Sequence, residues 1–218
     1  MRTPSTITRS FVVIAMLLLA TPAYAQLCLG APTFRTAPLQ VGLGVGFTDG
    51  VRAVEGTFAG GGEMLFGGAG VSVVNFTDVD VRTAGVSLFA GAEVATDAQR
   101  RVLLCPVVRF GFIAGPDIGS VDLSTTTIQG GANLGVIAAE SGDWMVVPFF
   151  GLSALYQRVK AEVGDGDESF SDTGGVADLG VGLIVNRTVG ITPSLAIPFS
   201  TGGDDPVFTI RITFNFGG

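Results

Sequence analysis

The chain has 218 residues, of which 47% are apolar and only 14% charged, with 33 Gly, 16 Phe and no His. Soluble globular proteins carry about 25% charged residues, so this composition argues against an ordinary soluble domain and against disorder. The excess of 19 acidic over 12 basic residues excludes the basic surface of a nucleic-acid-binding protein. The absence of His removes the commonest general base and metal ligand.

Residues 1–25 are typical of a cleaved export signal. Arg2 and Arg9 flank the start of an apolar run, Phe11–Ala20, and Ala23-Tyr24-Ala25 is a cleavage motif. The run is about half the length of a membrane-spanning helix, which needs ~20 apolar residues. We therefore predict a mature chain with 10 basic and 19 acidic residues. No later stretch has the length and hydrophobicity of a spanning helix, which leaves a secreted β protein or a transmembrane β-barrel.

From residue 39 onward the sequence alternates with period two, which predicts β-strands with one apolar and one small or polar face. Turn signals such as Thr48-Asp49-Gly50 and Ser141-Gly142-Asp143 separate the alternating runs. Residues 51–76 show the weakest alternation, so an eight-stranded arrangement stays open beside a ten-stranded one. The ten candidate strands cover about residues 39–47, 54–59, 64–76, 83–94, 102–112, 128–138, 144–157, 178–186, 189–199 and 207–216.

The predicted connections differ in length. Long ones are expected at 114–124 and in the acidic segment 162–175, and short ones at 141–143 and 186–188. Long extracellular loops and short periplasmic turns are the arrangement of outer-membrane barrels, and an even number of strands returns the C-terminus to the periplasmic side. The carboxylates of the acidic segment lack the spacing of a calcium loop, so we predict no metal site.

The two faces of the strands favour lipid over water. The face opposite the apolar one is rich in Gly, Ser, Thr and Asn, which is too weakly charged for the exterior of a soluble barrel. If the apolar face points outward, the small and polar residues line a narrow lumen. Trp144 and Tyr156 bracket the apolar face of one strand at the spacing of an aromatic girdle. Against this, four prolines fall inside candidate strands, where each needs a bulge or a strand end: Pro106, Pro148, Pro193 and Pro198.

The pattern of residues 39–218 resembles the small outer-membrane β-barrels of the OmpA/OmpX kind. The most specific part of the resemblance is the last strand, which looks like the signal that the barrel-assembly machinery reads. Gly217 and Gly218 follow its final aromatic residue, whereas the family usually ends on that residue. The alternating apolar residues of this strand are Phe208, Ile210, Ile212, Phe214 and Phe216.

The interior offers a disulfide and a set of charges. Cys28 and Cys105 are the two cysteines of an exported chain, and we predict that they pair and tether the periplasmic segment 26–38 across the lower mouth, with two free thiols as the alternative. Isolated ions in a narrow lumen are costly, so we predict a salt-bridged plug rather than a solute-selective ring. The expected lumen charges are Glu55, Glu93, Arg109, Asp178 and Arg211.

The sequence therefore predicts an all-β, closed, up-and-down transmembrane β-barrel with a structural or surface-binding role in the outer membrane of a Gram-negative-type bacterium. The alternatives are a narrow pore or carrier for small solutes and a secreted soluble β protein. A Ser-His-Asp site is impossible without His, so we predict no enzyme activity. We expect no cofactor, no nucleic-acid partner and a monomer in contact with outer-membrane lipid; the sequence does not identify an extracellular ligand.

Overall fold

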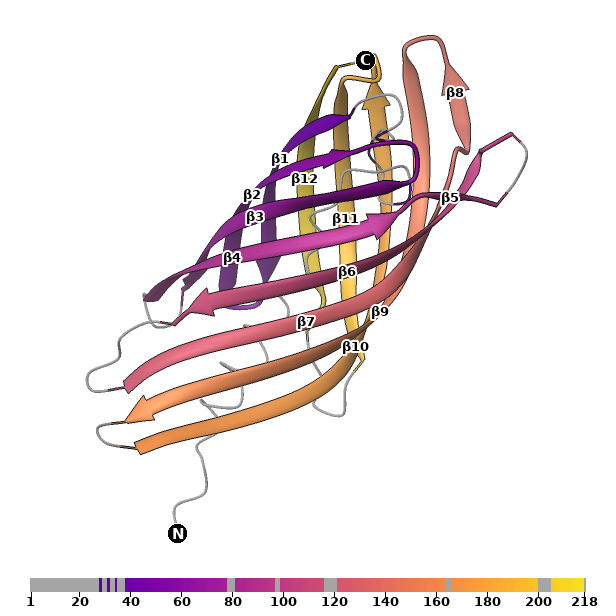
Figure 1. The fold of residues 1–218 in the computed structure, drawn as a ribbon. Helices are drawn as coiled ribbons and strands as arrows, with labels where there is room; N and C mark the ends of the chain where they lie inside the picture. The colour runs from indigo at the N-terminus through magenta and orange to yellow at the C-terminus, as the bar shows by residue number, and fades with distance from the viewer. Residues whose placement is uncertain are drawn as a thin grey trace.

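The molecule is a single antiparallel β-sheet that closes on itself (Figure 1). The computed structural model describes Cys28, Ala31, Phe34 and the ranges 38–77, 81–96, 99–115, 121–163, 166–199 and 205–217. The predicted export signal, residues 1–25, lies outside these residues. In the part of the chain that is described, ten long strands form the closed barrel, so the ten-stranded prediction is confirmed and the eight-stranded alternative is wrong.

Each strand pairs with its neighbour in sequence, and the last strand pairs with the first to close the barrel. Two short strands, β5 (Val94–Ala95) and β8 (Ala139–Ser141), extend the hairpins beside them. The long strands are β1 (Leu39–Thr48), β2 (Val51–Gly61), β3 (Leu65–Phe76), β4 (Val81–Ala92), β6 (Val102–Ala114), β7 (Val121–Val136), β9 (Trp144–Val163), β10 (Gly166–Val185), β11 (Val189–Phe199) and β12 (Val207–Phe216).

The strand register fixes the tilt and the width of the barrel. The row of paired residues that starts at Leu39 runs through Gly60, Gly67, Ala90, Val108, Gly130, Ala154, Gly175 and Phe199. The register of the β11–β12 and β12–β1 pairings continues this row around to β1. It returns at the level of position 51, which is twelve residues along the chain from its start at position 39. A shift of ~40 Å around ten strands spaced ~4.8 Å apart corresponds to a tilt of about 40° and a backbone radius of ~10 Å. Side chains fill a lumen of that size.

The apolar residues of the strands face outward, as the sequence predicted. In β12 the exposed and buried residues alternate without a break, so that Ile212 is 40% exposed while Arg211 is 5% exposed. Leu134 and Leu183 are likewise exposed, whereas Gly135 and Gly182 are buried. The sheet is therefore inside out relative to a soluble barrel.

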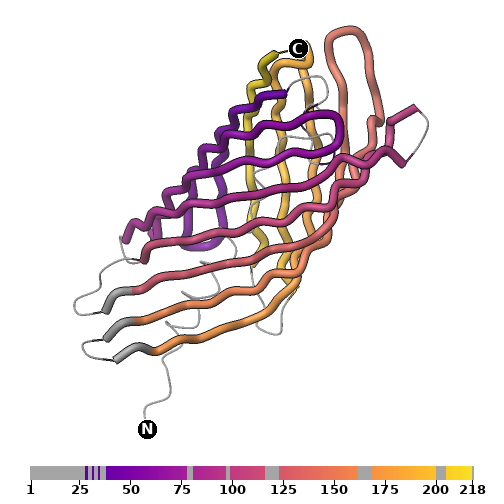
Figure 2. The backbone as a smooth tube through the Cα atoms, viewed as in Figure 1, coloured from indigo at the N-terminus to yellow at the C-terminus, as the bar shows by residue number. Residues whose placement is uncertain are grey.

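The two ends of the barrel differ. The proximal end holds the start of β1 and the end of β12, together with β5 and β8; the distal end holds the turn between β1 and β2 (Figure 2). At the proximal end β10 and β11 are joined by a turn in which Asn186 and Arg187 have φ of 51° and 56°. Two residues with positive φ match the right-handed twist of the flanking strands in a tight hairpin.

Two predicted loops are wrong in extent. The segment 162–175 is not a loop, because β9 and β10 stay paired out to Val163 and Gly166. The segment 114–124 is shorter than predicted, because β7 already begins at Val121. Backbone pairing continues there, with Val159 opposite Phe170, because β-branched and aromatic residues suit strands. As a result, β7, β9 and β10 project past the other strands as a three-stranded distal sheet (Figure 1).

The four strand prolines lie where a ladder is interrupted or ends. Pro106 lies opposite the break between β4 and β5, and Pro148 opposite the break between β7 and β8, where the register to β9 slips by one residue. Pro193 lies in a gap of the β10–β11 ladder, and Pro198 lies beyond the last β11–β12 pair. A proline lacks the N–H that a continuous ladder needs, so these breaks accommodate it.

Within the described residues, no helix is long and apolar enough to cross a membrane.

Candidate functional site

The barrel interior is the first candidate site, because it gathers the charges predicted for the lumen. The side chains of all five residues are buried, with exposed fractions between 3% and 7%. Their strands place them at similar heights, so that most belong to one polar belt across the middle of the barrel. The belt consists of Glu55, Ser87, Arg109, Gln129, Ser153, Asp178 and Arg211.

Glu55 is the centre of the belt. Arg109 Nη2 donates to Glu55 Oε1 at 2.6 Å, and Arg211 Nη2 lies 3.7 Å from Glu55 Oε2. The same Arg109 nitrogen donates to Ser87 Oγ at 3.0 Å. One carboxylate therefore binds two guanidinium groups from opposite directions. A buried charge needs such partners, because its loss of hydration costs several kcal/mol per ion, about as much as the pair recovers.

Glycines on the inner face make this arrangement possible. Gly44 of β1 pairs with Glu55 on one side and with Arg211 on the other, so the two charged side chains meet across a position without a side chain. At Gly70 of β3, an added Cβ would lie 2.8 Å from Ser87 Oγ and 3.2 Å from Glu55 Oε1. The inward glycines are thus required by the width of the salt-bridged side chains.

The other half of the belt is polar but contains a single charged side chain. Gln129 Nε2 donates to Ser153 Oγ at 2.8 Å. Asp178 and Asn133 flank Gly151, where an added Cβ would clash with the Asn133 amide. Asp178 Oδ1 accepts no hydrogen bond from the described residues. Glu93, the fifth predicted charge, lies nearer the proximal end, between β4 and β5, and is 7% exposed.

Apolar side chains fill the interior at the proximal end. Cys28 and Cys105 form a disulfide with Cα atoms 6.0 Å apart, and both cysteines are fully buried. Phe34, which like Cys28 precedes β1, is 1% exposed and stacks on Phe66 with ring centroids 5.5 Å apart. The sequence reasoning missed Phe34, since nothing in its neighbourhood alternates. The proximal cluster contains Cys28, Ala31, Phe34, Ala59, Phe66, Phe89, Leu103, Cys105, Val107, Val147, Phe149 and Ile184.

Two further apolar clusters lie on the inner face toward the distal end. The first is built from Val51, Ala53, Val74 and Phe76, against which Val81 packs. The second is built from Val176, Ala196 and Val207. The polar belt therefore lies between apolar layers, and the described side chains of the interior fill the barrel.

The outer face carries the predicted girdle residues and the predicted assembly signal. Trp144 and Tyr156 are 45% and 43% exposed and begin and end the apolar stretch of β9. Twelve residues at ~3.3 Å each, tilted by about 40°, span ~30 Å along the barrel axis, close to the apolar thickness of a membrane. The alternating residues of the last strand, from Phe208 to Phe216, are all exposed on the same face.

The distal sheet reverses this pattern. Past Tyr156, the residues of β9 that continue the outer face are Arg158 and Lys160, both exposed, while Val159 and Ala161 alternate with them. The predicted strand covers 144–157 and the predicted loop covers 162–175, so Arg158 and Lys160 belong to neither predicted element. Cations are thus the outward residues of β9 where its apolar stretch ends.

No protein-family model matches the chain. No curated protein sequence matches it either. Among solved structures, it is similar to a bacterial polysaccharide outer membrane secretin (12% identity, TM-score 0.45), covering 77% of this chain and 57% of that one. It is also similar to Ail, the attachment invasion locus protein of Yersinia pestis (14% identity, TM-score 0.43), covering 82% and 95% of the two chains. Neisserial surface protein A is similar at 11% identity and a TM-score of 0.42, covering 83% and 98%. Such low identities describe a likeness of fold alone, and the chain spans little more than half of the secretin chain.

Proposed function

We propose that the protein is an integral outer-membrane β-barrel with a structural role and a surface-binding role carried by its distal sheet. The observation that carries this proposal is the continuous apolar outer face, with residues such as Leu43, Leu88 and Val108 each more than half exposed. A soluble monomer rarely exposes an apolar patch larger than a few hundred Å². Contact with acyl chains gives these side chains an apolar environment all around the barrel.

The interior supports a structural role over transport. A water-filled pore needs a polar lumen that is open along its length. Here the polar belt lies between apolar clusters, and Cys28, Ala31 and Phe34 are buried in the cluster at the proximal mouth. Nothing in the described residues favours the pore or carrier alternative.

We also propose that the protein is not an enzyme. The chain contains no His, so acyl-transfer chemistry of the Ser-His-Asp kind has no base. Among the interior carboxylates, Glu55 already binds two guanidinium groups. Both oxygens of this carboxylate are therefore already engaged by guanidinium groups.

The orientation and the assembly route are part of the same proposal. The proximal end, with both ends of the barrel domain, would face the periplasm, and the distal sheet would project outside the cell. The exposed alternating residues of β12 are available to the barrel-assembly machinery before the barrel closes. We expect a monomer, since β12 already pairs with β1 and leaves the membrane-embedded strands without an open edge.

Membrane fractionation combined with a heat-shift gel tests the proposal. We expect the native protein in the outer-membrane fraction and, in unboiled SDS samples, a band that migrates differently from the boiled one because a closed barrel resists unfolding. A soluble fraction, or identical migration with and without boiling, would contradict the membrane barrel. Conductance steps in planar bilayers would contradict the closed interior and favour the pore.

A further inference from the structure

We propose that the outer face of β7, β9 and β10 binds one phosphorylated lipid of the surrounding membrane, with an acyl chain in a shallow groove and the phosphate at Arg158 and Lys160. The inference rests on the membrane location proposed above. It adds a ligand site, with a stated ligand chemistry, to a barrel whose interior is filled.

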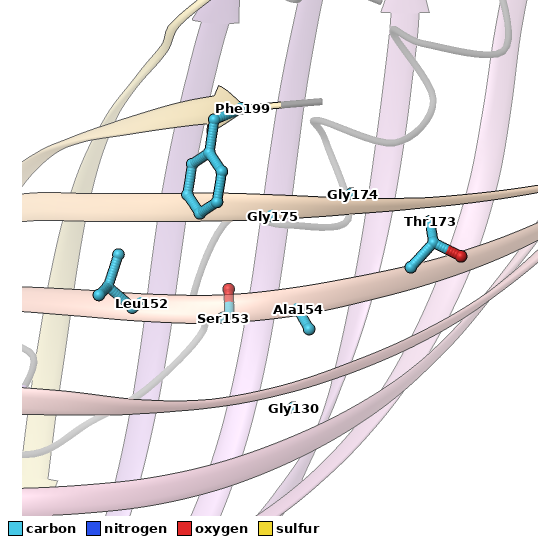
Figure 3. Close-up of a pocket in the computed structure, with 8 residues that line it drawn as sticks. All are labelled: Gly130, Leu152, Ser153, Ala154, Thr173, Gly174, Gly175 and Phe199. Atoms are coloured by element: carbon cyan, nitrogen blue, oxygen red, sulfur yellow. The ribbon is translucent and has the colours of Figure 1, made fainter. Parts of the chain in front are cut away.

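The groove lies on the apolar outer face toward the distal end (Figure 3). Its floor is one row of paired residues without large side chains, Gly130 of β7, Ala154 of β9 and Gly175 of β10. A Cβ added at Gly130 would meet no heavy atom within 4 Å, so the space above this position is open. The volume is about 600 Å³, within the ~300–1,000 Å³ typical of small-molecule sites.

Leu152 bounds the groove below its floor and Phe199 bounds it at one side, whereas Thr173 lines it above. Leu152 lies one row below the floor and is 50% exposed. Tyr156, paired with Ile128 and Thr173, lies one row above it. At the side, the ring of Phe199 leans over Gly175 and occupies the place of a side chain there (Figure 3). The result is an apolar slot that runs up to the aromatic rim of the barrel, which suits a hydrocarbon chain.

The residues directly beyond this rim suit a phosphate group. Arg158 is paired with Thr126 on one side and Ser171 on the other. Lys160 lies in the next row and is paired with Ser124 on one side and Ser169 on the other. Arg158 Nη2 lies 3.4 Å from Ser169 Oγ, so the guanidinium leans toward Lys160's row. Arginine, lysine and hydroxyl groups are the usual phosphate ligands, and basic clusters at the membrane surface bind anionic lipid headgroups.

The height of the cations matches the headgroup region. Arg158 lies two residues beyond Tyr156, which is ~7 Å along the strand, and Lys160 lies as far again. Tyr156 is a girdle residue, so both cations fall where lipid phosphates lie when the acyl chains contact the apolar face.

A second basic row on the barrel lacks a groove and so provides a matched control. Arg52 and Arg82 flank Asn75 across β2, β3 and β4 near the distal end, and both are exposed. The row beneath them is Val54, Val73 and Ala84, of which the two valines are 55% and 52% exposed. These bulkier side chains leave no row of small residues to form a floor.

The experiment measures lipid binding to the full-length barrel purified in detergent, by native mass spectrometry. The probes are dimyristoyl phosphatidic acid and dimyristoyl glycerol, which share acyl chains and differ in the phosphate. We expect one saturable phosphatidic acid site and much weaker binding of the diacylglycerol. The double variant Arg158→Gln/Lys160→Gln should weaken phosphatidic acid binding about thirtyfold, since each of the two surface cations contributes about 1 kcal/mol. The variant Gly130→Leu, which fills the groove, should abolish the saturable site.

The controls are Arg52→Gln/Arg82→Gln and Ala84→Leu, which change charge and bulk at the other basic row. Both should leave the saturable site unchanged. Equal losses in the two charge pairs would show general surface attraction and overturn the inference, as would full displacement by equimolar inorganic phosphate. Every variant is first checked for the heat-shifted band. If the parent protein lacks that band, the proposed function fails; if the band is present and no saturable lipid binds, only this inference fails.

Discussion

Glu55 and Arg109 are joined by a 2.6 Å hydrogen bond inside the barrel, although two strands, β3 and β4, separate them in the sheet. The Glu55 carboxylate lies above Gly70 of β3, which has no side chain to block the contact. Arg211 contacts the same carboxylate from β12. This three-residue cluster links β2, β6 and β12. It therefore joins the middle of the barrel to the strand that closes it.

The first prediction concerns this cluster. Glu55→Gln removes the carboxylate that two buried guanidinium groups share, and removal of one partner of a buried ion pair costs about 3–5 kcal/mol. We expect the free energy of unfolding, measured in urea with the barrel in lipid vesicles, to fall by that amount. The control is Glu140→Gln, which removes an exposed contact of 3.7 Å to Arg187 and should cost at most about 1 kcal/mol. Equal effects for the two variants would contradict the role of the cluster.

The second prediction concerns the disulfide. Thiol titration of the unfolded, unreduced protein should detect no free thiol, because the chain has two cysteines and they are bonded to each other. Cys28→Ser with Cys105→Ser should still give a heat-shifted barrel, but with a free energy of unfolding lower by about 2–5 kcal/mol. Reduced native protein should match the double variant. Two titratable thiols without reductant would show that the cysteines do not pair.

The third prediction concerns the depth of the girdle. Trp144 is the single tryptophan of the chain and lies at the proximal end of the outer face. Brominated lipids should therefore quench its fluorescence most when the bromine is close to the headgroup, not at the bilayer centre. Trp144→Phe with Tyr156→Trp moves the probe to the distal rim, where the same depth profile is expected. Strong quenching by a water-soluble quencher, with none from the lipids, would contradict the membrane position of both residues.

The fourth prediction separates the membrane-facing surface from the distal sheet. Ile210 is in the middle of β12 and faces outward, so Ile210→Lys places a charge near the bilayer midplane and should cost ~2–4 kcal/mol. Phe170 is 61% exposed but belongs to the distal part of β10, beyond the apolar band. Phe170→Lys should change the free energy of unfolding by less than about 1 kcal/mol. A larger loss in the free energy of unfolding for Phe170→Lys than for Ile210→Lys would contradict the assignment of β12 to the bilayer and of the distal sheet to the region outside it.

The alternation of the sequence is sufficient to predict most of the outer face, because successive side chains of a strand point to opposite sides. It assigns Ile212 to the outside and Arg211 to the inside before any fold is known, and the structure agrees. The alternation of the distal sheet was visible too, in Arg158 and Lys160 against Val159 and Ala161. The predicted strand nevertheless stops at residue 157, because the apolar residues switch faces beyond Tyr156, and residues 158–161 belong to no predicted element.

The register between paired strands could not be predicted from the local alternation of residues. A proline in an alternating run looks like an objection to a strand, and only the register shows that Pro148 lies opposite the slip between β7 and β8. The contact between Phe34 and Phe66 could not be predicted either, since no local periodicity marks Phe34 as a buried residue.

The chain's own pattern was thus enough to determine that its strands turn their apolar side chains outward, because period two is a local property of an extended backbone. Which inward residues meet depends on the number of strands and on the shift between them around the barrel. Only the closed structure decides that Glu55 lies between Arg109 and Arg211, and that Gly130, Ala154 and Gly175 lie in one row. Those neighbours come from different strands, brought together when β12 pairs with β1.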